Sequence, residues 1–544
     1  MIQINRHDDE STGGTRPDES VPISGSADRP NRQALIESAI IALCFAAYAG
    51  QLPPDVNESH YLTKAKHFYD AAYCPGDLFL GSSYSHWLFY ACTGWMTHFL
   101  SLATFAWVGR IIVWTATAFA WQRLCDAVVP MRWIAILSAA FFLLLNDRFH
   151  LAGEWVVGGF EAKSVATIFV VFALGQLARR DWKTVWPLLG AASAFHALVG
   201  GWCVVACGVA WWMTEVSMSA GLPSMTRLRN QVRRQVVPLA IGGVIALVGV
   251  LPPLIADWHA PAALARKAHS IYVHERISHH LWFDAFPVSH VARFAFITAC
   301  WFGLYRWLGN SRQVGSSEFH HRLRPLKYFA VGSLMISFAG LLLCGAADSG
   351  SFDGLHLDGL LRFYWFRLSD FAIPLTMSLA ACFVIRHWLV NRRDSARRAM
   401  AAIFIACVAG AAVLMMVERH QHGIANADRA SLPRFLDDPL RTRQIYDDWR
   451  TVCNWIRAHT PAESVFITPD QQQTFKWYAH RTEIVCWKDV PQDAVSMTVW
   501  WQRVEAIIFP QRRSSLGMLV YDDGQLAALA ENYNATHLLM SRSA

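Results

Sequence analysis

The first hydrophilic stretch, LPPDVNESHYLTKAKHFYD at 52–70, follows an apolar run and combines acidic, amide and imidazole side chains. A carboxylate at such a position is able to take a proton from a hydroxyl group, and Glu58 is the candidate general base. The structural alternative is a capping box, in which Glu58 turns back to the backbone at Asp55. Asn57 could instead cap this helix while Glu58 points inward. The sequence therefore leaves open whether Glu58 is a base or a capping residue.

A second charged stretch, NDRFHLAGEWVVGGFEAKSVA, begins at Asn146 and holds Glu154, Glu161 and Lys163 beside the next apolar run. Its neighbouring glycines, 158 and 159, would let another part of the backbone approach closely. The alternative is a hydrated rim, because charged side chains at a membrane edge reach water at little cost.

A third stretch, HSIYVHERISHHLWF at 269–283, holds four histidines. We favour phosphate contact, with Arg276 as a fixed charge and His279 or His280 as hydrogen-bond donors. A metal site is less favoured, because no acidic or cysteine partner stands at ligand-like spacing. A hydrated loop at the membrane surface is the remaining alternative.

A fourth stretch, LLRFYWFRLSDFAIP at 360–374, places Arg362 and Arg367 on either side of an aromatic run, with Asp370 three residues later. Arg367 and Asp370 are spaced to pair on one helix. An arginine among aromatic rings also suits bidentate binding of a phosphate. His196 lies in an apolar run near its end, where an ionisable group suggests function.

The elements that carry these residues are membrane spans. Hydrophobic residues make up 54% of the chain and charged residues only 16%, against about a quarter in soluble proteins. Apolar stretches recur at 34–50, 86–106, 108–125, 132–146, 164–178, 184–200, 202–214, 236–256, 290–308, 327–347, 369–389 and 400–417. The pattern predicts an all-α polytopic membrane protein with about 11–13 transmembrane helices. The formal net charge of +7 comes mostly from short basic loops, so it indicates membrane topology and not nucleic-acid binding.

Short basic clusters near 180, 225, 320 and 393 mark the cytoplasmic side. The loops 51–85, 147–163, 257–289 and 348–368 are then external. Three apolar stretches separate the first two of these loops, although parity requires an even number. One of the three, 86–106, is therefore the candidate for a segment that does not cross the membrane.

The two ends of the chain differ in character. Residues 1–33 are polar and are expected to be a disordered cytoplasmic segment without a cleavable signal, so 34–50 would act as an anchor. Residues 418–544 alternate helical patterns with short β-branched runs, which predicts a small extracytoplasmic α/β domain after the transmembrane domain at 34–417. Cys453 and Cys486 lie in that domain and are a candidate disulfide pair. Most of the 12 cysteines are expected to be buried and inert.

The pattern Asn57-Glu58-x-x-Tyr61-Leu62, placed after a first span and opening an amphipathic helix, resembles the first external loop of the membrane-embedded GT-C glycosyltransferases. The resemblance implies a GT-C-like fold and transfer of a sugar from a polyprenyl-phosphate carrier to an unidentified glycan, lipid or protein. It implies a catalytic carboxylate in this loop. The usual leading aspartate is Asn57 here, so the base role passes to Glu58 or Asp77 and a divalent metal is not favoured.

The same resemblance implies that the basic residues of the later loops hold the carrier's phosphate. The phosphate-binding candidates are Lys163, Arg276, His279, His280, Arg362 and Arg367, and the supporting candidates are Asn57, Glu154, Glu161, His196 and Asp370. The expected location is the bacterial inner membrane, with membrane lipids as partners and no cofactor. The alternative function is a membrane transporter, which is less favoured because the charges lie at loop edges and not at the bilayer midplane. Nucleotide chemistry is not expected, since the sequence has no P-loop or GxGxxG motif after a strand.

Overall fold

The computed structural model describes residues 31–216, 225–258, 260–311, 316–348, 356–391, 394–421, 423–431, 438–470, 472–513 and 521–539. Two predicted segments lie partly outside the described residues. These are the N-terminal segment 1–33, up to residue 30, and the external loop 348–368, at residues 349–355.

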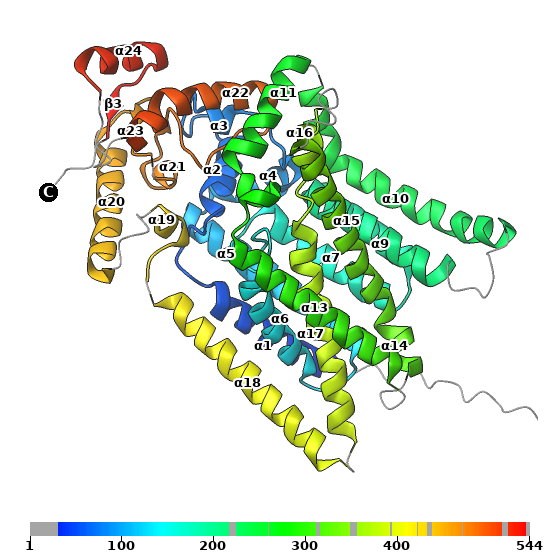
Figure 1. Ribbon diagram of the computed structural model, residues 1–544. Coiled ribbons are helices and arrows are strands. Elements are labelled where there is room, and N and C mark those ends of the chain that lie inside the picture. The colour runs from blue at the N-terminus through cyan, green and yellow to red at the C-terminus, as the bar shows by residue number, and fades with distance from the viewer. Residues whose placement is uncertain are drawn as a thin grey trace, which may run out of the picture.

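Long helices make up the body of the molecule (Figure 1). They are α1 (Asn31–Ala49), α5 (Leu102–Val128), α6 (Ile134–Arg148), α7 (Ala162–Ala178), α8 (Trp182–Phe195), α9 (Ala197–Trp211), α10 (Met225–Asp257), α13 (Val288–Asn310), α15 (Arg324–Asp348), α17 (Arg367–Val390) and α18 (Ser395–His420). In the described part of the chain, seven helices are long and apolar enough to cross a membrane. The protein is thus an all-α polytopic membrane protein in its main part, as predicted.

The predicted apolar stretch 86–106 does not form one span. It is divided between α4 (Trp87–Thr93), the 3₁₀ helix η1 (Gly94–His98) and the start of α5. The Ser101 side chain accepts from the backbone N–H of Thr104 at 3.2 Å and so caps α5 at its first turn. Two long helices, α5 and α6, therefore separate the loops 51–85 and 147–163, which satisfies parity.

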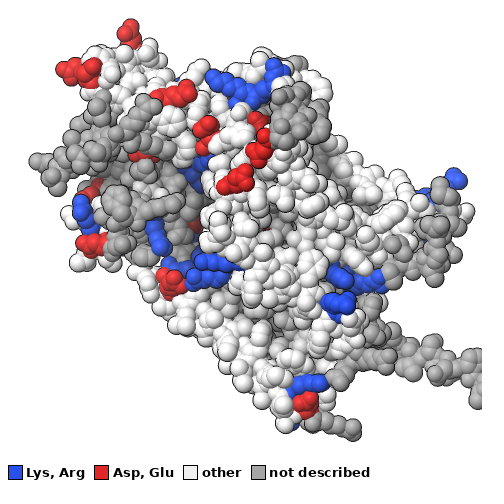
Figure 2. All heavy atoms as spheres, in the orientation of Figure 1, with Lys and Arg blue, Asp and Glu red and all other residues white. Residues whose placement is uncertain are grey.

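Charged side chains on the visible face gather toward the two ends of the helical body (Figure 2). A broad band without charge lies between them, over α13 and α15. Such a band is what a helical body presents to hydrocarbon, because the helices satisfy their own backbone hydrogen bonds there.

Shorter helices fill the connections. They are α2 (Glu58–Tyr69), α3 (Leu78–Gly81), η2 (Trp212–Val216), α11 (Ala262–Ser270), η3 (Ile271–Arg276), α12 (Ser278–Leu281), η4 (Phe283–Ala285), α14 (Ser316–Arg322) and α16 (Asp358–Leu361). Helix α2 buries Tyr61, Leu62 and Ala65 in the main core and lies at the same end of the body as α11 and α16 (Figure 1).

The C-terminal unit, defined here as the described residues from 426 to 539, covers that same end of the body (Figure 1). Its elements are α19 (Asn426–Ala430), α20 (Pro439–His459), β1 (Val465–Ile467), α21 (Phe475–Ala479), β2 (Thr482–Glu483), α22 (Ala494–Arg503), η5 (Val504–Ile508), α23 (Phe509–Arg513), α24 (Asp523–Tyr533) and β3 (His537–Leu538). The three strands form a parallel sheet in the order β2-β1-β3, with Val465 opposite Thr482 and Phe466 opposite His537. Cys453 and Cys486 are both buried and free, so no disulfide joins them.

Candidate functional site

Glu58 opens α2 and is fully buried against Arg110 of α5. Its Oε1 accepts from Arg110 Nε and from the backbone N–H of Phe160, both at 2.7 Å. Its Oε2 accepts from an Arg110 terminal nitrogen at 2.5 Å and from the backbone N–H of Asp55 at 2.7 Å. Four donors occupy the carboxylate, so no side of it is open to a substrate.

The structure therefore argues against the predicted role of Glu58 as a base and gives it a structural one. The bond to Asp55 is the reach-back half of the capping alternative. Gly159 makes this packing possible, because a Cβ there would come within 2.8 Å of the Glu58 side chain. The backbone N–H of Gly159 also donates to Asp55 Oδ2 at 2.8 Å, which ties the loop 147–163 to the start of α2.

Asp77, the second predicted catalytic carboxylate, is also committed elsewhere. It caps α3 by accepting from the backbone N–H of Leu80 at 3.0 Å. Its other oxygen lies 3.3 Å from Lys476 Nζ, which also pairs with Glu483 at 2.9 Å and with Asp489 at 2.6 Å. All four side chains are buried. Asp77 thus joins the first loop to the C-terminal unit and does not face the other predicted site residues.

Electrostatics explain how this four-residue cluster is stable. Burial alone would lower the pKa of Lys476, but Asp489, Asp77 and Glu483 hold that pKa well above its ordinary value. Burial raises the pKa of Glu483 to about 7, against the opposing effect of Lys476. Glu483, Cys486 and Asp489 are also spaced to hold a metal ion, yet the ammonium group of Lys476 is already paired with Glu483 and Asp489.

We expect Lys476→Met to lower the free energy of unfolding by about 3–5 kcal/mol, because Asp77, Glu483 and Asp489 would stay buried without a counterion. The measurement is thermal or denaturant unfolding of the purified protein in detergent, with the exposed Lys267→Met as control. The deficit should shrink as the pH falls toward about 7, because Glu483, whose pKa is about 7 beside Lys476 and higher without it, is protonated earlier in the variant and loses one uncompensated charge. Equal stability of the two variants at pH 8 would contradict this role.

A chain of polar contacts connects three distant loops and forms the candidate site. Asn57 donates to Glu161 Oε2 at 2.8 Å, and Glu161 Oε1 lies 3.4 Å from Lys163 Nζ. Lys163 is 2.9 Å from Glu154, whose other oxygen is 3.3 Å from Arg367 Nε. We call these five residues the loop network. It brings together the first loop, the loop 147–163 and the start of α17, and its members are candidate residues of the sequence analysis, namely Asn57, Glu154, Glu161, Lys163 and Arg367.

Asp370 does not pair with Arg367, although their spacing allowed it. Its buried carboxylate accepts from the backbone N–H groups of Leu151 at 2.6 Å, Ala152 at 2.9 Å and Glu154 at 3.2 Å. Asp370 therefore holds the loop 147–163 in place and leaves Arg367 to Glu154. This is a supporting role, because Asp370 binds the backbone of Glu154 and not the charged side chains of the loop network.

Tyrosine rings lie beside Arg367. Its guanidinium carbon is 4.1 Å from the ring centroid of Tyr364, and the Tyr364 hydroxyl is 2.9 Å from that of Tyr272 in η3. Arginine over an aromatic face keeps its charge while losing water. The contact brings the third loop, 257–289, to the same end of α17.

The four histidines of the third loop do not meet as one metal site. Three have separate partners: Arg362 for His269, Asp358 for His274 and the carbonyl of Ala152 for His280. His279 packs on His280 with ring centroids 4.0 Å apart. His280 thus contacts the loop 147–163 through Ala152, and burial, followed by the charge of Arg367, lowers its pKa and keeps it neutral. Arg362 is bound to His269 and makes no contact with the network.

His196 lies between α8 and α9 and caps the second of these helices. Its Nδ1 accepts from the backbone N–H of Val199 at 3.3 Å, and its ring stacks on His86 at 4.8 Å. This capping bond gives His196 a local structural role beside any contribution to the site.

Sequence reasoning missed Arg110 and Lys476. Arg110 stands within the apolar run that becomes α5, and an ionisable residue inside a span is itself a signal that a partner exists. Lys476 carried no comparable signal, because its three carboxylates come from Asp77 in the first loop and from residues 483 and 489.

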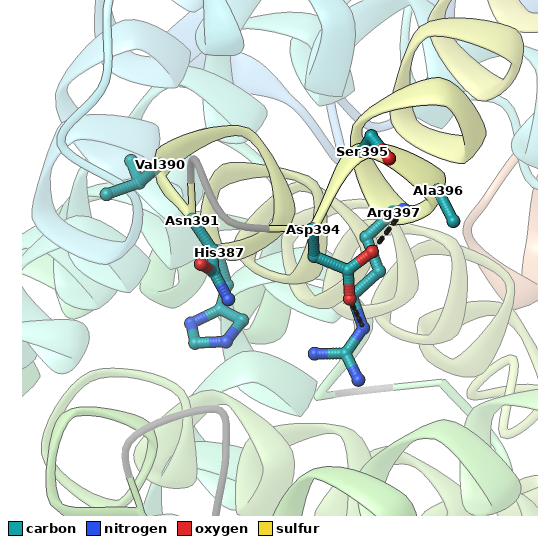
Figure 3. Close-up of a pocket in the computed structure, with 7 residues that line it drawn as sticks. All are labelled: His387, Val390, Asn391, Asp394, Ser395, Ala396 and Arg397. Carbon is teal, nitrogen blue, oxygen red and sulfur yellow. Dashed lines mark hydrogen bonds and ion pairs between the residues drawn. The ribbon is translucent and has the colours of Figure 1, made fainter.

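One open cavity of about 710 Å³ lies at the opposite end of α17, where this helix turns into α18 (Figure 3). Its lining residues are His387, Val390, Asn391, Asp394, Ser395, Ala396 and Arg397. Asp394 caps α18 and pairs with Arg397 at 2.9 Å, so its charge is satisfied locally. This cavity is remote from the loop network and holds none of the predicted site residues.

Comparisons with known proteins give matches of two kinds. A family model described as a domain of unknown function, DUF6798, matches residues 447–507. No curated protein matches the sequence. The chain is similar to an oligosaccharyltransferase of Archaeoglobus fulgidus tethered to an acceptor peptide with the NVT sequon, with a TM-score of 0.46 and 12% identity over 93% of this chain and 68% of that one.

Two further solved structures are similar at the same level. One is the oligosaccharyltransferase AglB from Archaeoglobus fulgidus with an inhibitory peptide and a dolichol-phosphate, at a TM-score of 0.42 and 12% identity over 93% of this chain and 69% of that one. The other is ArnT from Cupriavidus metallidurans bound to undecaprenyl phosphate, at a TM-score of 0.42 and 14% identity over 94% of this chain and 96% of that one.

Proposed function

We propose that this protein is a GT-C-type glycosyltransferase, which moves a hexosyl or pentosyl group from a polyprenyl-phosphate carrier to a glycan, lipid or protein acceptor. The observation that carries the proposal is the loop network, in which carboxylates and cations from three loops meet at one end of a membrane helix bundle. The donor class rests on the first-loop resemblance and on the cations beside it.

The network suits an anionic leaving group. Lys163 and Arg367 lie in the first turns of α7 and α17, where the backbone N–H groups of a helix N-terminus also favour negative charge. When the sugar is transferred, the polyprenyl phosphate departs as a stable anion, so this leaving group needs no strong general acid. These two cations would hold that anion as the bond to the anomeric carbon breaks.

Glu161 is our candidate for the base, in place of Glu58. It accepts from Asn57 on one oxygen, lies 3.4 Å from Lys163 on the other, and its side chain forms a capping box with Ser164 at the start of α7. A carboxylate offers about four acceptor positions, so Glu161 keeps capacity for the acceptor hydroxyl. The acceptor oxygen would bond to the anomeric carbon, its proton would pass to Glu161, and the electrons of the broken bond would stay on the phosphate.

The orientation in the membrane follows from the two ends of the same helices. The network is at the N-terminal ends of α7 and α17, whereas Arg179, Arg180 and Arg386 lie near their C-terminal ends. Basic residues collect on the cytoplasmic side, so the network and the C-terminal unit would be extracytoplasmic. We propose the bacterial inner membrane as the location, with no metal or organic cofactor.

The test is incubation of the purified protein with a set of labelled polyprenyl-phosphate sugars and envelope glycans, lipids or proteins as acceptors. We expect label to leave the carrier and polyprenyl phosphate to accumulate, and Arg367→Gln to slow this by about 10²-fold through loss of a charge-assisted contact. Arg441→Gln, at an exposed arginine of α20, is the matched control. Movement of intact lipid-linked sugar across proteoliposomes without bond cleavage would favour the transporter alternative and overturn the proposal.

A further inference from the structure

The connection between β2 and α22 holds Lys488 on a rigid backbone. The indole of Trp500 donates to the carbonyl of Cys486 at 3.0 Å, and the backbone N–H of Val490 donates to the carbonyl of Lys488 at 3.1 Å. Next to it, Asp489 is bound to Lys476 at 2.6 Å. The loop is therefore fixed on both sides of Lys488.

This connection meets the third loop at Arg276. Arg276 Nε donates to the carbonyl of Trp487 at 2.9 Å, and its guanidinium carbon is 5.3 Å from the Trp487 ring centroid. Within the described residues, neither Arg276 nor Lys488 forms an ion pair, and the Lys488 ammonium group makes no hydrogen bond. Two partly buried cations thus lie near each other without a carboxylate bound to either.

Contacts of η3 place the connection that carries Lys488 near the loop network. Arg276 of this helix contacts Trp487, and Tyr272 of the same helix bonds Tyr364, the ring under Arg367. Burial is the main cause that lowers its pKa to about 8, and repulsion from Arg276 is the next. Glu161 and Asp489 oppose this effect, while Arg367 adds to it. Because the interaction between two charges weakens with distance, these effects agree with the placement that the contacts of η3 give.

Two histidines are affected by the same cations. Burial lowers the pKa of His60 in α2, followed by the charges of Lys488 and Arg276. Lys488 also contributes to the lowered pKa of His280. Cations from the C-terminal unit, the third loop and α17 thus act on the same groups. Arg367 is paired with Glu154, whereas Arg276 and Lys488 have no carboxylate bound to them in the described residues, which leaves these two available to an anion.

We propose that Lys488 is an anion-binding residue supplied by the C-terminal unit, which completes with Arg276 and Arg367 a subsite for the phosphate ester of the donor. The inference rests on the proposed function and deepens it. The C-terminal unit would then be part of the site, because Asp77 and Lys476 lock it to the first loop and Trp487 locks it to the third.

The experiment measures binding, which needs no turnover. Thermal stabilisation of the purified full-length protein in detergent is titrated with polyprenyl phosphate, with uncharged polyprenol and with inorganic phosphate. We expect Lys488→Gln to weaken polyprenyl phosphate binding by about tenfold or more, since bonds to charged groups are the strong ones. Lys267→Gln, at an exposed lysine of α11, should bind as the wild type does.

Stability without ligand separates binding from folding. Lys488 has no bonded partner among the described residues, so Lys488→Gln should leave unfolding of the free protein unchanged or slightly improve it by removing repulsion from Arg276 and Arg367. A fold destabilised by this variant to the extent of Lys476→Met would overturn the inference.

The pH dependence gives an independent readout. As the pH rises through about 8, Lys488 loses its charge and the affinity for polyprenyl phosphate should fall. His60, His280 and Tyr272 stay neutral in that range because burial moves their pKa values away from it. Lys64 has a pKa lowered to about 7, mainly by burial, but its ammonium group is bonded to Ser82 and two backbone carbonyls. Lys488→Arg should therefore abolish the fall, and a fall that persists in this variant would contradict the assignment.

The outcomes distinguish the two proposals. Weaker binding of polyprenyl phosphate to Lys488→Gln, with polyprenol unaffected, supports the subsite even if no sugar transfer is found. An equal loss for inorganic phosphate identifies the phosphate group alone as the ligand, whereas a loss confined to polyprenyl phosphate identifies the lipid-linked ester. Active sugar transfer with unchanged binding and turnover in Lys488→Gln would refute the subsite and leave the transferase proposal standing.

Discussion

Glu161→Gln should lower the turnover of sugar transfer by about 10²–10⁴-fold, the usual contribution of a positioned general base. Glutamine keeps the shape of the side chain and an oxygen that accepts from Asn57, so the local fold should be preserved. The variant removes a negative charge beside Lys163 and therefore should not weaken binding of the donor phosphate. We expect the loss in kcat, with the donor affinity equal to that of the wild type or slightly higher.

The measurement is steady-state transfer together with donor binding, and Glu463→Gln at an exposed position of the C-terminal unit is the matched control. Glu161→Asp should retain part of the activity, because the carboxylate remains but stands farther from the acceptor. Turnover of Glu161→Gln within about threefold of the wild type, far short of a general base's contribution, would remove Glu161 from the mechanism.

Glu58→Gln should destabilise the protein by about 3–5 kcal/mol, because it leaves the buried guanidinium of Arg110 without a counterion. Arg110→Met should have a comparable cost for the opposite reason, since Glu58 would then be buried and unpaired. Apolar replacement of both residues should cost less than the sum of the single changes, because no unpaired charge remains.

Unfolding of the two single variants and of the double variant Glu58→Met with Arg110→Met, measured in the same detergent, gives the coupling between the pair. A role of Glu58 as the base, the other possibility that the sequence leaves open, predicts instead that Glu58→Gln abolishes transfer and leaves folding intact. Wild-type thermal stability in an inactive Glu58→Gln variant would restore Glu58 as the base.

The composition of the chain was enough to predict a helical membrane protein and most of its spans. Runs of apolar residues can be buried in lipid only as helices, so composition and length decide that structure locally. The same reasoning left 86–106 uncertain, because Ser101 begins α5 within that stretch and only parity between the loops pointed to the interruption.

The sequence by itself determined which loops carry charge and that the late-loop Arg367 and the second-loop Lys163 lie on the side of Asn57. It did so because charged residues must leave the hydrocarbon at known places along the chain. Only the tertiary structure decided which carboxylates are bound by a distant cation. Glu58 is paired with Arg110, 52 residues away, and Asp77 with Lys476, roughly 400 residues away. A salt bridge between residues so far apart depends on how the helices pack and not on the spacing of residues in the sequence.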